Sequence, residues 1–376
     1  SSRATRLGGG DFAAYWSAAY LLRQGRDFYD PASMKQVQDT LVHTGLEATI
    51  MAWNPPSLVA LLLPLAWLPF ESARAVWLVA NVMMVVGSCL VLARIYLPSQ
   101  RWGALAMCGF ALSFPQVLTG IVLGQVTFLV LLGLALSVLC VQRERWFWAG
   151  AALILTSAKP HMAILAAPYL LLVMAHRRRW AGWLGLLCAG AVCGAILFAL
   201  RPAWVADFVD LLHIAPLDWA TPTLGGVLSA LGITEVARYA IGLFLPAVVW
   251  LAQRPSASAE ASVAWLTTIT VPLTFFGWSY DQSLLLIPAA QLLAWLAESR
   301  PAALRLGFGV ALALMMAAVY LQRIISTDEV YFVWVPVYWG ITHGLGWWLL
   351  RPGRISAAAS DGGPDVPRGA ASEQIG

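Results

Sequence analysis

The sequence predicts an all-α protein that crosses a membrane many times. Of its 376 residues, 60% are apolar and only 11% are charged, about half the charged fraction of a typical soluble domain. Many apolar runs approach or exceed the roughly 18 residues that span a bilayer as a helix. The 19 tryptophans suit a chain with many membrane–water boundaries, where amphipathic aromatic rings collect.

The apolar runs predict about eleven crossings in a polytopic helical bundle. Several runs are short, and we interpret these as broken or re-entrant helices whose free backbone groups are shielded by protein or a water-filled cavity. The runs cover residues 73–96, 103–119, 126–141, 146–158, 162–175, 180–200, 236–251, 262–278, 283–297, 304–321 and 332–350.

The region before the first long run is predicted to carry short helices outside the membrane. Residues 13–24 have amphipathic helical spacing, which suits a helix that lies at the membrane surface. Asp30 is predicted to cap a second helix, with Pro31 at the first helical position. Residues 57–69 are apolar but too short to span, so we interpret them as a re-entrant helix.

Three regions follow from these patterns. Residues 1–56 are predicted to form an extracytoplasmic loop with interfacial helices, and residues 57–350 the transmembrane domain. Residues 351–376 are rich in Gly, Pro, Ala and Ser and are predicted to be a disordered cytoplasmic tail. We expect the chain to be a fragment that begins after a first spanning helix.

Arginines divide the loops between the runs into two sets. By the positive-inside rule the arginine-rich set is cytoplasmic, so the net charge of +4 reflects topology. No basic tract alternates with exposed aromatics, which argues against nucleic acid as a partner and leaves membrane lipids. The arginine-rich set contains Arg94, Arg101, Arg143, Arg145, Arg177, Arg178, Arg179, Arg254, Arg300, Arg305, Arg351 and Arg354.

The opposite, extracytoplasmic loops collect the unusual polar residues of the chain. They hold Asp11, the turn at 120–125, Lys159-Pro160-His161, the long loop 202–235 and Tyr280-Asp281. Because these groups converge on one membrane face, we expect the functional site there.

No cofactor or metal is predicted. The five cysteines all lie within apolar runs and none forms a CxxC pair, so they are expected to be neither disulfides nor zinc ligands. A metal site could use Asp207, Asp210 and His213, but the solvated face of an interfacial helix over 203–213 is favoured. The chain has no DxD, HExxH or Walker motif.

Asp11 is the first candidate for catalysis. It stands in Gly10-Asp11-Phe12, shortly before Tyr15-Trp16. An Asp after glycines could simply cap the helix that follows. Alternatively it is a general base at the water–lipid boundary, with a pKa tuned by its aromatic neighbours. The two roles are compatible only if the side chain faces a cavity and not its own backbone.

Lys159 is one of only two lysines in the chain, and Pro160 and His161 follow it. A loop lysine can extend its ammonium to the membrane interface without any specific ligand. The functional alternative is an ammonium that binds a phosphate near the membrane surface. His161 could add a second donor when protonated, or a neutral hydrogen bond.

Two further polar pairs lie between apolar runs on the same predicted face. Tyr280-Asp281 could cap the helix that follows it. Gln125, after Gly124, could hydrogen-bond a sugar hydroxyl, and a turn-and-cap role is equally open. We include Tyr15, Trp16, Gln125, Tyr280 and Asp281 as expected sugar or acceptor contacts.

In this order the residues resemble the bacterial polyprenyl-phosphate-mannose-dependent α-1,2-mannosyltransferases, glycosyltransferase family 87, which have a GT-C fold. The resemblance covers most of residues 8–350. The motifs are Gly10-Asp11-Phe12-x-x-Tyr15-Trp16, Gly25-x-x-x-Tyr29, Asn54-Pro55-Pro56 with Leu63-Pro64 and Leu68-Pro69, Gly124-Gln125, Gly150 leading to Lys159-Pro160, and Tyr280-Asp281 before Leu284-Leu285-Leu286. Asn54 departs from the pattern, because an aromatic residue often precedes the double proline.

The resemblance implies a GT-C-like enzyme of the bacterial cytoplasmic membrane with its active site outside. Family members transfer a sugar, usually mannose, from a polyprenyl-phosphate donor to a hydroxyl of a glycolipid or glycan acceptor, with inversion. Asp11 matches the position of the family's base. The departing phosphate needs fixed cationic donors, for which we expect Lys159 and His161, and no metal is required because the leaving group is a stable anion.

Two alternatives remain at this point. A secondary transporter would also have short, proline-interrupted segments, but it would place its polar residues near the bilayer midplane and show internal repeats, which this sequence lacks. A non-catalytic protein that binds a lipid-linked sugar would keep the same site, and only an activity measurement separates it from the enzyme.

Overall fold

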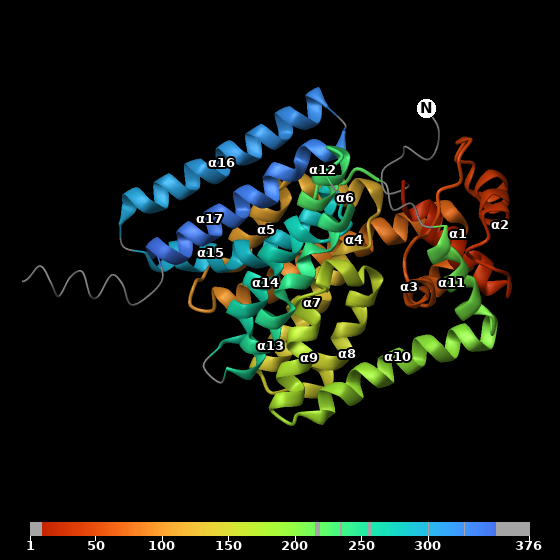
Figure 1. Ribbon diagram of the computed structural model, residues 1–376, viewed down its shortest axis with the longest axis horizontal. Helices are drawn as coiled ribbons and strands as arrows, with labels where there is room; N and C mark the ends of the chain where they lie inside the picture. The colour runs from red at the N-terminus through yellow and green to blue at the C-terminus, as the bar shows by residue number, and fades with distance from the viewer. Residues whose placement is uncertain are drawn as a thin grey trace, which may run out of the picture.

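The computed structural model describes residues 10–214, 219–233, 235–254, 257–299, 301–326 and 328–350 (Figure 1). Within these ranges the protein is all-helical and has no β-strand, as predicted. The expected disordered tail, 351–376, lies outside the described residues, as does the segment 1–9.

Short 3₁₀ or π segments (η) are interspersed among the α-helices. They are α1 (Phe12–Arg23), α2 (Pro31–Val37), η2 (Gln38–Val42), α3 (Pro56–Leu62), η3 (Leu63–Trp67), α4 (Phe70–Tyr96), α5 (Gly103–Ser113), α6 (Pro115–Leu123), α7 (Thr127–Gln142), α8 (Trp146–Leu153), η4 (Ile154–Ala158), η5 (Pro160–Ala163), α9 (Ala166–His176), α10 (Trp180–Leu200), α11 (Trp204–His213), α12 (Leu224–Ala230), η6 (Glu235–Phe244), α13 (Leu245–Gln253), α14 (Ala259–Leu273), η7 (Ser279–Leu285), α15 (Leu286–Glu298), α16 (Ala302–Ile325), η8 (Glu329–Val333) and α17 (Trp334–Leu350).

Each predicted apolar run contains a helix, but the helices differ in length. Among the described residues, α4, α10 and α16 are long and apolar enough to cross a membrane. Helices α5 and α6 would make a fourth span if counted together, with a bend of 69° between them. The bend falls at Pro115, because the residue before a proline avoids the helical region and Phe114 accordingly has φ −83° and ψ 112°.

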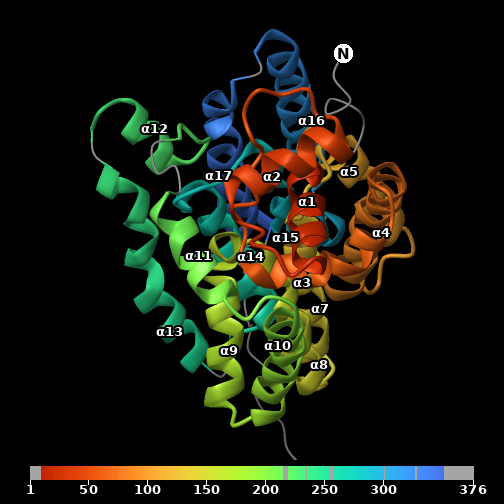
Figure 2. The same ribbon diagram turned by 90° about the vertical axis from the view of Figure 1, so that its right-hand side faces the viewer.

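The N-terminal helices α1, α2 and α3 lie together at one end of the molecule (Figure 1), the end that faces the viewer in Figure 2. The predicted cap of α2 is confirmed, since the Asp30 carboxylate accepts a hydrogen bond from the Ser33 N–H at 2.9 Å and Pro31 begins the helix. Helix α1 was expected to lie at an interface, yet the structure encloses it in protein. Its side chains from Phe12 to Leu22 are buried, except for the half-buried Tyr20.

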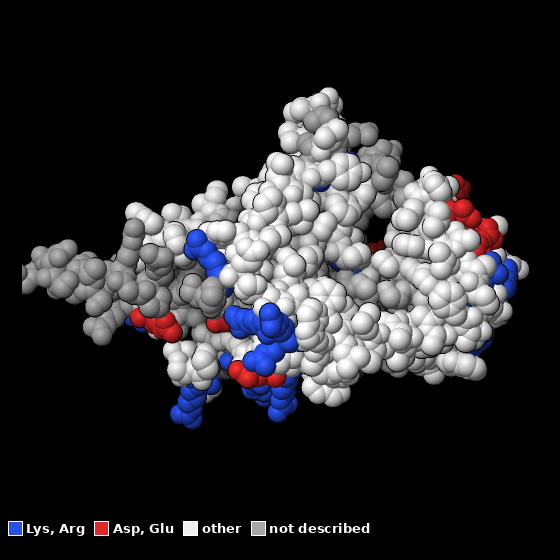
Figure 3. Space-filling view, turned by 60° about the horizontal axis from the view of Figure 1, so that its bottom comes forward, with Lys and Arg blue, Asp and Glu red and all other residues white. Residues whose placement is uncertain are grey.

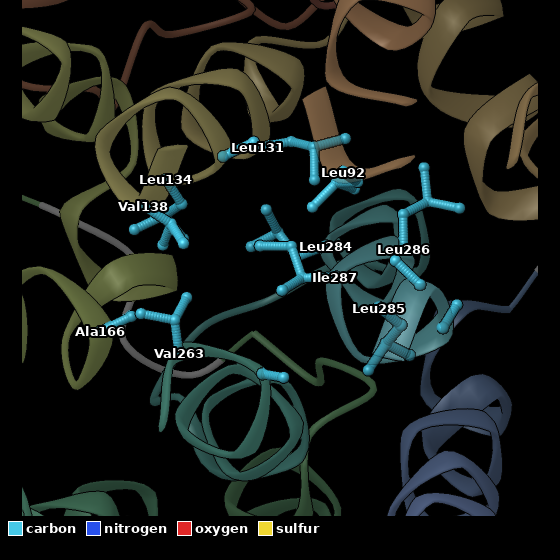
Figure 4. Close-up of a cluster of buried hydrophobic side chains, with 14 of the residues drawn as sticks. Leu92, Leu131, Leu134, Val138, Ala166, Val263, Leu284, Leu285, Leu286 and Ile287 are labelled. Carbon is cyan, nitrogen blue, oxygen red and sulfur yellow. The ribbon is translucent and has the colours of Figure 1, made fainter. Parts of the chain in front are cut away.

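The larger hydrophobic core is built from α4, α7, α9, α14, α15 and α17. Figure 4 shows Leu131, Leu134 and Val138 of α7 in this core together with Leu284 from the end of η7 and Ile287 from the start of α15. Helix α7 is buried on almost every side, as expected for a helix that is hydrophobic all round. The core therefore holds in place α7, which follows Gln125 in the chain, and α15, which follows Asp281.

Three of the described arginine-rich loops, at Arg143, Arg179 and Arg254, lie at the end of the bundle opposite those polar residues. Helices α7 and α8 form a hairpin that separates Arg143 from Gln125 by the length of α7. The C-termini of α9 and α13 meet there too, since His176 and Gln253 line one small cavity. Figure 3 shows Lys and Arg side chains collected on this part of the surface.

Candidate active site

Asp11 lies directly before α1, where the C-terminal end of α6 holds its backbone. Helix α6 ends at Gly124, which takes the left-handed conformation (φ 72°) common after a helix. This leaves the Leu123 carbonyl free to accept the Asp11 N–H at 3.1 Å. Asp11 occupies the cap position of α1, but its side chain makes no capping hydrogen bond. Its carboxylate instead accepts a hydrogen bond from Gln125 Nε2 and lines a cavity.

Lys159 lies at a break between two short helical turns. The following Pro160 disfavours helix at Lys159, whose φ of −144° and ψ of 77° separate η4 from η5. The side chain is only 6% exposed, and its ammonium pairs with Asp281 Oδ1 at 2.7 Å. Lys159 is therefore not a surface lysine at the interface, because a specific carboxylate holds its charge inside the protein.

Asp281 is surrounded by hydrogen-bond donors. Besides the Lys159 ammonium, its carboxylate accepts the Thr127 hydroxyl and the Trp278 N–H, the latter at 2.9 Å. Asp281 does not stand at the cap position ahead of a helix, as the sequence allowed, but lies inside η7, whose cap position is Trp278. Its bond to the Trp278 N–H closes the first turn of η7. Thr127 comes from the first turn of α7, which places Asp281 against the α6–α7 junction.

Gln125 joins these groups into one network. Its Oε1 accepts from the Lys159 ammonium at 3.1 Å and from the Tyr15 hydroxyl at 3.4 Å, and its Nε2 donates to Asp11. The Tyr280 ring completes the cluster, with the Lys159 ammonium 4.7 Å from the ring centroid. Four chain segments that are distant in sequence, around Asp11, Gln125, Lys159 and Asp281, thus meet in one network.

The network forms one wall of a cavity of about 780 Å³. This volume falls within the usual range for ligand sites. Asp11, Tyr15, Lys159, His161 and Tyr280 reach its surface, whereas Gln125 and Asp281 lie behind them. The remaining wall is mostly apolar and aromatic, with Trp53, Leu211, Leu212, Trp219, Tyr239, Phe275, Phe276 and Trp278.

Burial shifts the pKa values of Asp11 and His161, which both line the cavity. Burial raises the pKa of the Asp11 carboxyl above its ordinary 3.8, and the charge of Asp281 adds to this, while Lys159 and hydrogen bonds from Tyr280 and Gln125 lower it. Burial also lowers the pKa of His161 to about 4. His161 is therefore neutral at pH 7 and can offer a neutral hydrogen bond.

The structure does not bring every expected residue to the cavity. Trp16 turns away from it, donates its indole N–H to the Leu65 carbonyl at 3.2 Å, and packs on Phe70. In the alternative metal trio, Asp207 pairs with Arg201 at 2.8 Å on α11, which begins one residue after the expected helix 203–213. The described residues contain no group of three metal ligands, and all five cysteines are free.

Sequence reasoning missed Thr127 and the aromatic wall. Thr127 follows Gln125 by two residues, so a hydroxyl on the first turn of α7 was the available signal. The wall brings together Trp53, Trp219 and Trp278, whose rings are in contact at 5.6–6.1 Å between centroids. Tryptophan is so frequent in this chain that nothing in the sequence marks these three.

One comparison with known proteins found a match. The model of glycosyltransferase family 87 matches residues 53–279. The chain belongs to this family. Gln125, Lys159 and His161 lie inside the matched range, and Asp11 and Asp281 lie outside it but contact its residues. Searches of curated proteins and of solved structures found no match. Family membership makes the protein a membrane-associated glycosyltransferase that takes a sugar donor and an acceptor.

Proposed function

We propose that the protein transfers a sugar, mannose in the first instance, from a polyprenyl-phosphate donor to a hydroxyl of a glycolipid or glycan, with inversion. One observation carries the proposal: the Asp11 carboxylate lines the cavity and makes no bond to its own helix. A carboxylate with a free edge in a cavity, beside a buried ammonium, has the parts needed to activate a hydroxyl and stabilise a departing phosphate.

Asp11 acts as the general base in this proposal. As the acceptor oxygen attacks the anomeric carbon, its proton passes to Asp11 and the bond from that carbon to the phosphate oxygen breaks. Gln125 and Tyr280 hydrogen-bond to Asp11, which orients its carboxylate toward the cavity. The raised pKa makes this carboxylate, when ionised, a stronger base than an exposed one.

Lys159 and His161 hold the donor phosphate. An ammonium has three N–H donors, and two of those on Lys159 go to Asp281 and Gln125. The third is available to a phosphate oxygen at the cavity surface. His161 lines the same cavity and contributes a neutral donor. Tyr15 and Tyr280 define the side on which the sugar lies, and Gln125 and Asp281 support them from behind the wall.

The aromatic wall suits the lipid part of the donor. Trp219, Phe275 and Phe276 give the cavity a surface that favours an isoprenoid chain over water. Trp278, whose N–H is bonded to Asp281, adjoins the polar groups and is suited to stack on the sugar ring. This division lets one cavity hold a donor whose two halves differ in polarity.

We further propose that the shorter apolar helices complete a GT-C-like bundle of about eleven crossings in the bacterial cytoplasmic membrane, with the site on the extracytoplasmic face. The separation of Arg143 and Arg254 from the Asp11–Lys159 end supports this orientation through the positive-inside rule. In the same scheme residues 1–56 lie outside the cytoplasm.

The test is a transfer assay with the full protein in lipid nanodiscs. Radiolabelled mannose, glucose or arabinose on polyprenyl phosphate is offered with a panel of glycolipid and glycan acceptors, and GDP-mannose serves as the alternative donor. Transfer from the lipid donor that is lost in D11N supports the proposal. Transfer from GDP-mannose alone, or no transfer to any acceptor, overturns it.

A further inference from the structure

A second polar cluster lies beside the site and involves the end of α16. The Arg323 guanidinium pairs with Glu329 at 2.7 Å and donates to the Ser279 hydroxyl at 2.5 Å. The other Glu329 oxygen accepts the Ser279 N–H at 2.9 Å. Arg323 thus bonds to the side chain of Ser279, and Glu329 bonds to its backbone. We call Arg323, Glu329 and Ser279 the clamp.

The clamp adjoins the turn that presents the site. Ser279 directly follows Trp278, whose N–H is bonded to Asp281, and directly precedes Tyr280. Directly after Asp281, Gln282 donates to the carbonyl of Phe332 in η8 at 3.1 Å. The turn is therefore fixed from one side by the clamp and from the other by Lys159 and Thr127.

We propose that Arg323 and Glu329 are positioning residues for the glycosyl-transfer site. They hold the 278–281 turn so that Asp281 meets Lys159 and Tyr280 meets Asp11. Neither residue lines the cavity, and both lie outside the range 53–279 that the family model matches. The C-terminal hairpin α16–η8–α17 therefore contributes to catalysis through contact with the turn, and not through contact with the substrate.

The physical reason is that small displacements of reacting groups cost far more in rate than in stability. A shift of about 1 Å in a positioned group can lower a rate about 100-fold. The Arg323–Glu329 pair itself is about one quarter exposed, and ion pairs with that much exposure contribute little to folding. Loss of the clamp should thus reduce turnover without a comparable loss of stability.

The inference rests on the proposed function, so the first measurement is transfer by the wild-type protein. Given that activity, R323Q is expected to lower kcat about 10–100-fold with KM for the lipid donor changed by less than about threefold. Q322A is the matched control at the same end of α16, because Gln322 accepts a hydrogen bond from Trp334 Nε1 at 2.6 Å and does not touch the turn. It should retain wild-type kcat.

A double-variant cycle separates positioning from a general loss of folding. If Arg323 acts through Asp281, the loss in R323Q/D281N is smaller than the product of the two single losses, whereas Q322A and D281N multiply. E329Q, which keeps an oxygen for the Ser279 N–H, should retain more activity than R323Q and gives a second variant if R323Q does not fold. Wild-type kcat in R323Q, or independent losses in the cycle, would overturn the inference while leaving the proposed function intact.

Discussion

Replacing Asp11 with Asn tests the proposed base directly, because the structure allows the substitution with little else changed. Asn has the same shape, and its side-chain oxygen can still accept the hydrogen bond from Gln125 Nε2. The Lys159–Asp281 pair does not depend on Asp11. Burial already disfavours the ionised form of Asp11, so a neutral side chain removes a cost of folding.

The expected effect is therefore large on the rate and small on the fold. General base catalysis contributes about 10²–10⁴-fold, and D11N should lower kcat by that factor, or about 3–5 kcal/mol in activation free energy. The unfolding temperature should equal or slightly exceed that of the wild type. Donor binding, which uses Lys159, should stay within about threefold.

Single-turnover transfer from radiolabelled polyprenyl-phosphomannose measures the rate, and retention of the labelled donor on a filter measures binding. D11E is the matched variant, since it keeps a base but displaces it, and it should retain more activity than D11N. A D11N protein with wild-type kcat would refute Asp11 as the base. A D11N protein that fails to bind donor would show that Asp11 belongs to the donor site.

Two further sets of variants examine the groups around Asp11. K159A removes the ion-pair partner of the buried Asp281 carboxylate, so it should lower the free energy of unfolding by about 3–5 kcal/mol and also weaken donor binding. The double variant K159M/D281L, measured by thermal unfolding and by filter binding, should recover stability but not donor binding. Recovery of both would contradict the role of Lys159 in phosphate binding. The second prediction concerns the pH dependence of the rate. Asp11 acts as a base only when it is ionised, so kcat/KM should fall as the pH decreases through its pKa, which burial raises above 3.8. Because the hydrogen bond from Gln125 lowers that pKa, Q125L should move this acid limb to higher pH, and an unmoved limb would mean that another group titrates.

The sequence predicted the helical elements well where they depend on composition and on proline. Helix α10 begins and ends at the predicted residues, and Asp30-Pro31 begins α2 as expected. The apolar run 262–278 was a partial error, since α14 ends at Leu273 and the last five residues form the loop before η7. Apolar aromatic residues in that loop line the cavity, so hydrophobicity alone could not distinguish them from a helix.

The sequence predicted which residues belong to the candidate site, but not which of them contact one another. Asp11, Lys159 and Asp281 stood out because isolated charges between apolar runs are rare. Whether each side chain capped its own helix or joined a site depended on tertiary contacts over more than a hundred residues, such as Lys159 with Asp281. Trp16 shows the limit of motif reasoning, because it stands in the same motif as Asp11 but points into the packing beneath α1.

The Lys159–Asp281 pair is difficult to explain by stability. A buried ion pair often contributes no more than two apolar residues of the same volume would, because both charges lose their hydration. In a chain with so few charges, an apolar pair at the same positions would be the simpler way to fill the space. Leucine and methionine could not place an ammonium at the cavity surface. The Lys159–Asp281 pair does so, with one N–H donor of Lys159 free and the Asp11 carboxylate lining the same cavity. Thr127, Gln125 and the Trp278 N–H then complete its hydrogen bonds, as a buried charge requires. A buried pair that is hydrogen-bonded on every side but the cavity therefore argues for an anionic ligand at this end of the molecule.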